Sequence, residues 1–184
     1  EEIAVVTAET PFYAESGGQI GDTGTISSAH GSLSVLDTQK VAGNTIVHIC
    51  RVVEGEVTAD IAARLEVAES RRKKLRLHHS ATHLLHLALR EVLGTHVKQA
   101  GSRVSDQTTR FDFSHFEPIT QEQLREIETI VNDEIRQNHP IVTEVLPIEE
   151  AKRSGAVALF DEKYGEIVRV VQIGPRSREF CGGT

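Results

Sequence analysis

The chain of 184 residues contains no methionine, and its first two residues are both glutamate. An independently translated protein starts with methionine unless it is processed, so we expect this chain to be a segment of a longer one. No apolar run approaches the roughly 18 residues of a membrane-spanning helix, and the first residues lack a signal-peptide pattern. The composition therefore predicts no association with a membrane.

Cysteine is scarce as well, with only Cys50 and Cys181 in the chain. Two cysteines do not make the disulfide framework of a small secreted protein, so we expect a reducing, cytoplasmic setting. Cys50 ends the apolar run Thr45–Cys50 and is interpreted as a core residue. Cys181 is different, because it begins the segment Cys181-Gly182-Gly183-Thr184, in which glycines allow the backbone to approach another group closely.

Positive charge is in deficit, since the formal net charge is −7, and this argues against a broadly basic surface for nucleic acid. One segment is nevertheless strongly basic, Arg71-Arg72-Lys73-Lys74-Leu75-Arg76. It is interpreted either as a solvated helical face or as a local phosphate-contacting patch, which Lys98, Arg103 and Arg110 could extend. The sequence leaves both interpretations open.

A histidine pair, His79 and His83, is the most informative positive feature. Residues four apart lie on one face of a helix, so the two imidazoles can bind one zinc ion, with the Cys181 thiolate as a third ligand. Three protein ligands leave a position for water or substrate. Ser80 follows His79 where the His-Glu-x-x-His motif of zinc proteases needs glutamate, which argues against that class. The pair lies opposite an apolar stripe formed by Ala81, Leu85, Ala88 and Val92.

The first third of the chain is expected to form a small β-barrel-like unit. Its runs of β-branched residues bounded by glycine predict four strands, at Ile3–Val6, Gly31–Leu36, Thr45–Ile49 and Val57–Ile61. Residues 11–24 contain four glycines and predict an ordered loop. It is either a plain connection or, given its polar side chains, a loop that faces a site.

The remainder predicts alternating helices and strands. Helices are expected at Glu66–Gly94 with a glycine C-cap, at Thr120–Asn138 with a capping box of Thr120 and Gln123, and at Ile148–Arg153. Strands are expected at His96–Gln99, Thr109–Phe113, Ile141–Val145 and Ile167–Ile173, with a turn at Gly101-Ser102. The predicted fold is α+β, with residues 1–62 as the β unit and residues 63–184 as helices packed on a mainly antiparallel sheet.

Several segments together resemble the editing domain of alanyl-tRNA synthetase, over nearly the whole chain. They are residues 11–22, His78–His86, Gly94–Gln99, Arg110–His115 and Cys181–Thr184. Each segment alone is a weak match, but the whole set in this order is specific to the family. The domain is shared in part with free-standing alanyl-tRNA editing proteins and, more remotely, with threonyl-tRNA synthetase.

The resemblance implies hydrolysis of mischarged Ser-tRNA(Ala) and Gly-tRNA(Ala) at a zinc site, with the tRNA acceptor end and the rest of the synthetase chain as partners. Its implied zinc ligands are His79, His83, Cys181 and a histidine after Thr184, a position beyond the printed sequence. Zinc would either orient the substrate amino group or polarise water. A Cys181 nucleophile is disfavoured, because a zinc-bound thiolate is a poor one.

The remaining site residues are assigned from their side chains and from the resemblance. Gln99 and Gln19 are expected to be catalytic, as neutral amides that position water or the aminoacyl carbonyl. Substrate binding is expected at Glu15, Ser16, Gly17, Gly18 and Arg110. Two alternatives stay open at this point, a non-catalytic tRNA-binding module and a free-standing trans-editing deacylase.

Overall fold

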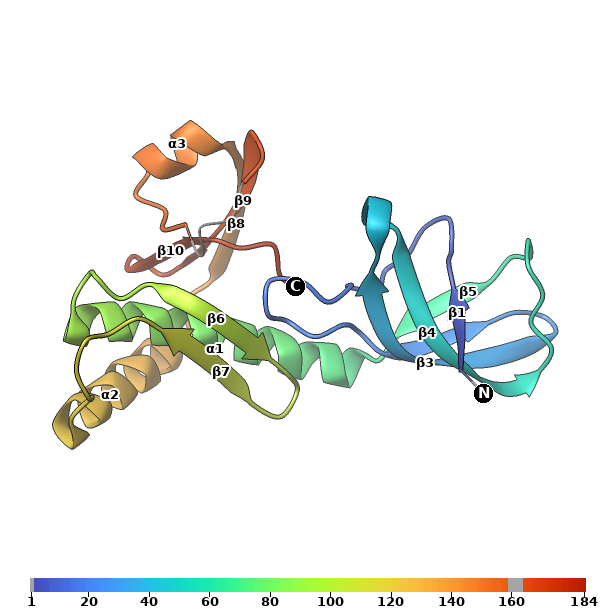
Figure 1. Ribbon diagram of the computed structural model, residues 1–184, viewed down its shortest axis with the longest axis horizontal. Helices are drawn as coiled ribbons and strands as arrows, with labels where there is room; N and C mark the ends of the chain where they lie inside the picture. The colour runs from blue at the N-terminus through green and yellow to red at the C-terminus, as the bar shows by residue number, and fades with distance from the viewer. Residues whose placement is uncertain (1, 159–163) are drawn as a thin grey trace. The chain divides into compact units, whose positions relative to one another are not determined.

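The computed structural model describes residues 2–158 and 164–184, and it divides by compactness into two units (Figure 1). The first contains the residues up to Arg76 together with Ser105–Gln107 and Thr184, and the second contains Leu77–Val104 and Thr108–Gly183. The division falls inside α1 (Glu69–Leu93). The domain boundary expected after residue 62 stays a prediction. Among the helices of the described ranges, none is both long and apolar enough to span a membrane.

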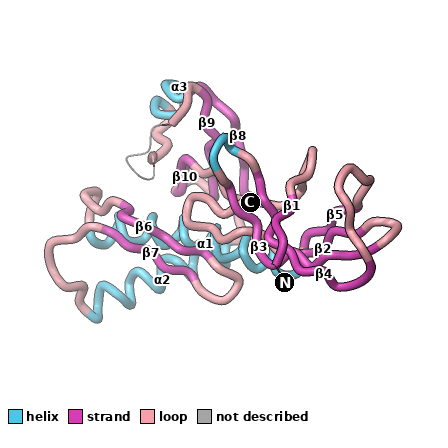
Figure 2. The backbone as a smooth tube through the Cα atoms, turned by 45° about the vertical axis from the view of Figure 1, so that its right-hand side comes forward, coloured by secondary structure: helices cyan, strands magenta, loops and turns pink. Residues whose placement is uncertain are grey.

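Five antiparallel strands form the sheet of the first unit, in the spatial order β1-β4-β3-β2-β5 (Figure 2). They are β1 (Glu2–Val5), β2 (Gly24–Ser27), β3 (Gly31–Lys40), β4 (Ile46–Gly55) and β5 (Arg64–Val67), with a short 3-10 helix, η1 (Ala42–Asn44), between β3 and β4. In the part of the chain that the structure describes, no pairing joins β1 to β5. The expected barrel-like closure is therefore not confirmed.

The core of this unit lies on one side of β3 and β4. Leu33, Val35 and Cys50 are buried together, which confirms Cys50 as a core residue. An irregularity in the β3–β4 register between Val35 and Asp37 shifts the alternation by one residue. The side chain of Thr38 is consequently buried, whereas strict alternation from Val35 would have turned it outward.

Asp22 holds the glycine-rich loop of residues 11–23 in place. Its side chain is about 1% exposed, and its Oδ2 accepts a hydrogen bond of 2.6 Å from the backbone N–H of Tyr13. The guanidinium of Arg72 donates to the same carboxylate, with Nε 2.9 Å from Oδ1. Arg71 donates to the carbonyl oxygen of Gly21 at 2.8 Å. Two arginines of the basic cluster therefore have structural partners within the unit.

Helices and antiparallel strands together build the second unit. Its helices beyond α1 are α2 (Gln121–Gln137) and α3 (Ile148–Arg153). Its strands are β6 (Gln99–Val104) and β7 (Thr109–Phe113), which form a two-stranded ribbon, and β8 (Ile141–Pro147), β9 (Ile167–Ile173) and β10 (Ser177–Phe180), which form a sheet in the order β10-β9-β8. This mixture of helices and antiparallel sheets confirms the α+β class.

The main core of the second unit lies between the two long helices and the ribbon. Ala88 and Leu89 of α1 pack with Ile127 of α2, and Phe111 and Phe113 of β7 pack against them. Leu84 of α1 belongs to a separate cluster with Val171 and Ile173 of β9. Helix α1 thus contributes to two apolar layers, and this arrangement fixes the face that its polar residues occupy.

The turn between β9 and β10 is tied to both long helices by Arg176. Its Nη1 donates to Glu134 of α2 at 2.6 Å, and its Nη2 is paired with Glu91 of α1. The side chain of Glu134 is about 1% exposed, so this arginine supplies the positive charge that a buried carboxylate needs. The ion pairs set where β10 begins and so where the residues after it lie.

Several local predictions are confirmed and others are wrong. The capping box of Thr120 and Gln123 is present, and strands or helices occupy Thr109–Phe113, Ile148–Arg153 and Ile167–Ile173 as expected. The strand expected at Val57–Ile61 is wrong, because β4 continues to Gly55 and the next strand is β5. The turn expected at Gly101-Ser102 is also wrong, since both residues lie inside β6, next to a register irregularity that accommodates a glycine.

Replacing Asp22 with Ala should lower the free energy of unfolding by about 3 kcal/mol, because Arg72 would lose its carboxylate partner in a largely buried setting. Urea unfolding followed by far-UV circular dichroism measures the change. Glu66→Ala is the matched control: it removes the partner of Arg64 from a pair whose side chains are more than half exposed, and should cost less than about 1 kcal/mol. Equal losses in the two variants would contradict the structural role of Asp22.

Candidate metal centre

Helix α1 places His79 and His83 one above the other on one face. Their rings are stacked, with centroids 5.1 Å apart and an interplanar angle of 18°. The spacing of four residues in a helix produces this overlap. His83 is buried and His79 is partly exposed, so the pair runs from the interior toward the surface.

Cys181 reaches the same place from the segment after β10. Its backbone is fixed against β9, because its N–H donates to the carbonyl oxygen of Arg169 at 3.0 Å and its own carbonyl accepts from the Arg169 guanidinium at 2.7 Å. The Sγ atom lies 3.2 Å from Nε2 of His79. One ligand atom from each of His79, His83 and Cys181 lies within 4.8 Å of the others.

Gly183 allows this approach. A Cβ atom at this position would overlap the ring of His79, so only glycine fits. Its backbone N–H also donates to Sγ of Cys181 at 3.4 Å, which favours the thiolate form. Gly182 has open space around it, so the requirement applies to the second glycine of the pair and not to the first.

A buried carboxylate, Glu179, sets the orientation of His83. The side chain of Glu179 is paired through Oε2 with Nδ1 of His83 and accepts through Oε1 from Nδ1 of His86 at 2.7 Å. A carboxylate only accepts hydrogen bonds, so each Nδ1 carries the proton. Nε2 of His83 is then the atom left to face a metal, and it is buried.

Sequence reasoning missed Glu179. One signal for it was present, because residues two apart in an extended segment point to the same side, and Glu179 lies two residues before Cys181. A carboxylate beside a metal-binding histidine is the usual means of fixing its ring. His86 was seen only as part of a polar stripe, and the structure shows it as the second partner of this carboxylate.

The two cysteines differ in their chemistry. Burial raises the pKa of the Cys50 thiol to about 11, so it stays protonated. Burial also acts to raise the pKa of Cys181, but His79 and His83 outweigh it through hydrogen bonds and charge and bring the pKa to about 5. Cys181 is therefore a thiolate at neutral pH, and the thiolate is the form that binds metals.

The surroundings of His83 favour positive charge. Burial acts to lower its pKa, but Cys181 and Glu179 together raise the pKa to about 10. Burial likewise acts to raise the pKa of Glu179, and His83 and His86 lower it. Two anionic groups thus enclose a buried imidazole. Two histidine nitrogens and one thiolate are a donor set that suits zinc, so the residues fit that ion.

The other predicted site residues of the second unit lie on the ribbon. Gln99 opens β6 opposite Phe113, and Arg110 lies in β7, exposed and 3.1 Å from Oδ2 of Asp112. Neither belongs to the group formed by His79, His83 and Cys181. Their catalytic and substrate-binding roles stay predictions.

The remaining predicted residues lie in the glycine-rich loop of the first unit. Ser16 and Gln19 exchange two backbone hydrogen bonds around Gly17 and Gly18, whose φ angles of 56° and 82° are those of a tight hairpin turn. Gln19 is fully buried, and its amide nitrogen donates to Oγ1 of Thr184 at 2.9 Å. Glu15 accepts from the Gln39 side chain at 3.0 Å. These contacts explain the loop structurally and leave its substrate-binding role a prediction.

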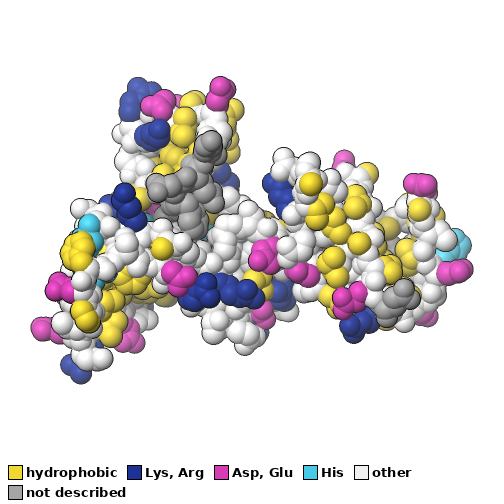
Figure 3. All heavy atoms as spheres, in the orientation of Figure 1, with side chains coloured by type: hydrophobic (Ala, Val, Ile, Leu, Met, Phe, Trp, Pro, Cys, Tyr) yellow, Lys and Arg dark blue, Asp and Glu magenta, His cyan; other side chains and the backbone are white. Residues whose placement is uncertain are grey.

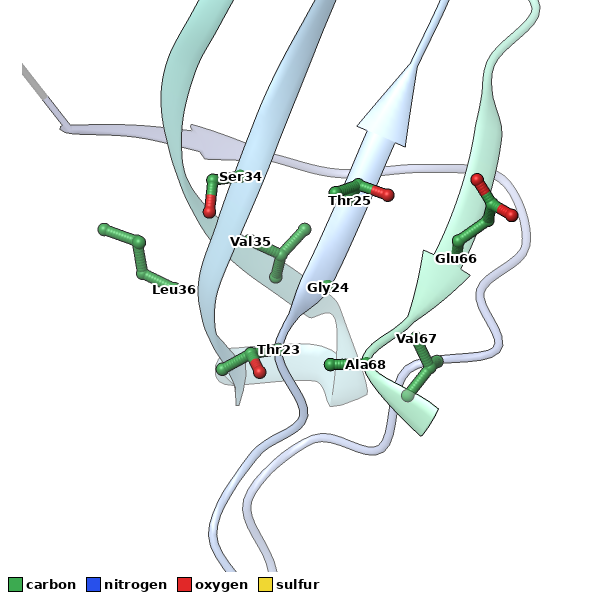
Figure 4. Close-up of a pocket in the computed structure, with 9 residues that line it drawn as sticks. All are labelled: Thr23, Gly24, Thr25, Ser34, Val35, Leu36, Glu66, Val67 and Ala68. Carbon is green, nitrogen blue, oxygen red and sulfur yellow. The ribbon is translucent and has the colours of Figure 1, made fainter. Parts of the chain in front are cut away.

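An open hollow of about 540 Å³ lies over β2, β3 and β5 of the first unit (Figure 4). Its lining contains one ionisable side chain, Glu66, and that carboxylate accepts from Arg64 at 2.8 Å. A single paired carboxylate supplies neither a metal site nor an acid–base pair. The group of His79, His83 and Cys181 therefore remains the best candidate for chemistry.

Comparison with known proteins relates the chain to tRNA synthetases. Residues 1–71 match the family described as tRNA synthetases class II (A). An alanine–tRNA ligase of Legionella pneumophila (strain Lens) is 52% identical over 181 residues, which are 98% of this chain and 21% of that protein. One from Anaeromyxobacter dehalogenans is 52% identical over all 184 residues, 20% of its length. The chain thus spans about a fifth of the length of the ligases to which it is homologous.

Replacing Glu179 with Gln should weaken zinc binding roughly 10- to 100-fold, because an amide cannot accept from both Nδ1 atoms and His83 loses its fixed ring orientation. Competition against a chromophoric chelator measures the affinity. Glu144→Gln is the control, since Glu144 is a half-exposed carboxylate of the same unit that is paired with Arg178 at 2.5 Å. It should leave zinc affinity unchanged, and a similar loss in both variants would rule out orientation by Glu179.

Proposed function

We propose that this chain hydrolyses the aminoacyl ester of mischarged Ser-tRNA(Ala) and Gly-tRNA(Ala), as the editing segment of an alanine–tRNA ligase. The observation that carries the proposal is the convergence of His79, His83 and Cys181 within 4.8 Å, in a chain homologous to part of such ligases. Two histidines and one cysteine are a donor set typical of zinc sites.

The need for such an activity follows from the sizes of the amino acids. A pocket that accepts alanine cannot exclude the smaller glycine by size, and it rejects an added hydroxyl group, as in serine, only weakly. Binding alone therefore leaves errors on the tRNA. A second, hydrolytic site removes them after they are formed.

His79, His83 and Cys181 would hold the zinc ion in this proposal. Bound zinc would supply a Lewis acid that either polarises a water molecule or orients the substrate amino group. Cys181 acts as a ligand and not as a nucleophile, because a metal-bound thiolate attacks poorly. In the reaction one water adds to the ester carbonyl, the bond from the acyl carbon to the ribose oxygen breaks, and the ribose oxygen takes a proton.

The remaining residues position the reactants. Glu179 keeps the proton on Nδ1 of His83, so Nε2 would be the atom that holds the metal. Gln99 and Gln19 are proposed to direct water or the aminoacyl carbonyl through their neutral amides. Glu15, Ser16 and the two glycines after them are proposed to contact the aminoacyl group, and Arg110 the RNA. The partners would be the tRNA(Ala) acceptor end and the rest of the ligase chain.

The isolated chain should release serine from Ser-tRNA(Ala) and glycine from Gly-tRNA(Ala) while sparing Ala-tRNA(Ala), in a zinc-dependent reaction. Replacing both His79 and His83 with Ala should abolish hydrolysis, since two of three ligands are lost. Release of labelled amino acid over time, with and without a chelator, measures the activity. Unchanged hydrolysis in the double variant would eliminate this metal centre as its basis.

Two further variants separate metal loss from other effects. His30→Ala removes an exposed histidine of the first unit and should leave both zinc content and hydrolysis unchanged. Gln99→Ala should lower the rate while zinc stays bound, because an amide is not expected among the ligands. RNA binding without hydrolysis in the unaltered, zinc-loaded chain would instead identify a non-catalytic tRNA-binding module.

Adding a histidine after Thr184 should tighten zinc binding, because a fourth protein ligand completes a tetrahedral set. The expectation rests on the family pattern in which histidine follows Cys-Gly-Gly-Thr. Chelator competition compares the 184-residue chain with the extended one, and an added glutamine provides the control for length. Equal affinities in all three chains would show that the assignment of a ligand at this position is wrong.

A further inference from the structure

The ribbon formed by β6 and β7 has two different faces. Phe111 and Phe113 point to the helices and belong to the core, and the buried Val104 marks the same face on β6. Because side chains alternate along a strand, Arg110 of β7 lies on the opposite, outer face. Arg103 is its direct partner across the ribbon and therefore shares that face.

The outer face carries positive charge that the fold compensates only in part. Like charges directly opposite each other destabilise a strand pair, yet Arg103 and Arg110 occupy such positions. Arg110 is paired with Asp112 but stays 66% exposed. Arg103 is exposed, and within the described ranges its side chain makes no ion pair or hydrogen bond. An anion between the two guanidinium groups would relieve the repulsion.

The other end of the same ribbon carries an exposed aromatic surface. The rings of His96 and Phe116 are stacked with centroids 4.1 Å apart and an interplanar angle of 24°. Nε2 of His96 lies 2.9 Å from Nδ1 of His115, which fixes both histidines. Phe116 is 79% exposed, so it contributes little to the core. The stacked histidine instead holds a flat aromatic face toward solvent.

The aromatic and basic features lie at the two ends of the same ribbon. The N–H of Ser114 donates to the carbonyl oxygen of Lys98 at 3.0 Å, which extends the β6–β7 ladder toward the aromatic rings. From Gln99 to Arg103, β6 covers roughly 13 Å at the rise of a strand, and His96 lies three residues before it. Figure 3 shows Lys and Arg side chains over the end of β6 and histidine with hydrophobic side chains over the loop before it.

We infer that the outer face of the β6–β7 ribbon binds single-stranded RNA, with a base stacked on Phe116 and phosphates on Arg103 and Arg110. Proteins that bind single strands combine aromatic side chains for the bases with a basic path for the backbone. The inference rests on the proposed function for its source of RNA, the unpaired 3′ end of the substrate tRNA. A net charge of −7 opposes general attraction, so these local arginines carry the contact.

Fluorescence anisotropy of the 184-residue chain tests this with two labelled RNA hairpins, one with a four-nucleotide single-stranded 3′ tail and one without. Phe116→Ala should weaken binding of the tailed hairpin about 5- to 150-fold and leave the blunt hairpin unaffected, because only the tail offers an unpaired base. Val145→Ala, at an exposed apolar position of the same unit, should change neither.

Salt dependence tests the two arginines. Replacing Arg103 and Arg110 together with Gln should reduce the slope of log affinity against log salt by roughly 1.4, the value for two phosphate contacts on a single strand. The charge-matched control replaces the exposed Arg125 and Arg136 of α2 with Gln and should leave the slope unchanged. Circular dichroism establishes that all variants are folded.

Equal weakening for both hairpins, or equal slopes in the two double variants, would overturn the RNA-binding face. The measurements are made with and without chelator, so that they do not depend on the metal centre. Loss of tail binding in Phe116→Ala without any deacylation by the parent chain would support this face and refute the proposed function. Deacylation by the parent chain, together with unchanged tail binding in Phe116→Ala, would support the proposed function and refute this RNA-binding face.

Discussion

The geometry of the second unit depends on the contacts between the buried carboxylate of Glu179 and the rings of His83 and His86. A carboxylate away from water costs several kcal/mol unless charged or hydrogen-bonding partners surround it, and here two imidazoles of α1 supply them. The three consecutive residues Glu179, Phe180 and Cys181 contact the histidine helix, an apolar cluster and the candidate metal centre in turn. Displacing one would displace the others.

The arginines of the chain fall into two groups that composition cannot separate. Arg72 and Arg176 neutralise carboxylates that are nearly inaccessible to water, and they hold a loop and a turn in place. Arg103 and Arg110 face solvent across a two-stranded ribbon. An acidic protein can therefore present a local cationic surface, because its excess of acidic residues is distributed elsewhere and partly compensated within the fold.

Much of the second unit was predictable because its signals are local. The capping box of Thr120, the strand Thr109–Phe113 and the helix Ile148–Arg153 depend on neighbouring residues, and the structure has them as expected. The convergence of His79 and His83 with Cys181 could be anticipated because the histidine spacing is helical and because of the family resemblance.

The features that the sequence did not predict depend on contacts between residues far apart in the chain. β2 and β10 are four residues each and form because longer strands lie beside them. The Gly101-Ser102 pair looked like a turn, but Gly101 pairs with Asp112 within the ribbon. Glu179 was missed because its two histidine partners are far away in sequence, and only the folded chain shows that it is buried.

The convergence of His83 with Cys181, which lies about a hundred residues later in the chain, has a consequence for how the protein unfolds. A metal held by His83 and Cys181 would act as a cross-link that closes a loop of about a hundred residues. In the chain-entropy view, a closure of that length disfavours the unfolded ensemble by about 4.7 kcal/mol. Most of the second unit lies between these two residues. Loss of such an ion would therefore remove a restraint from the whole intervening chain as well as from the side chains that held it.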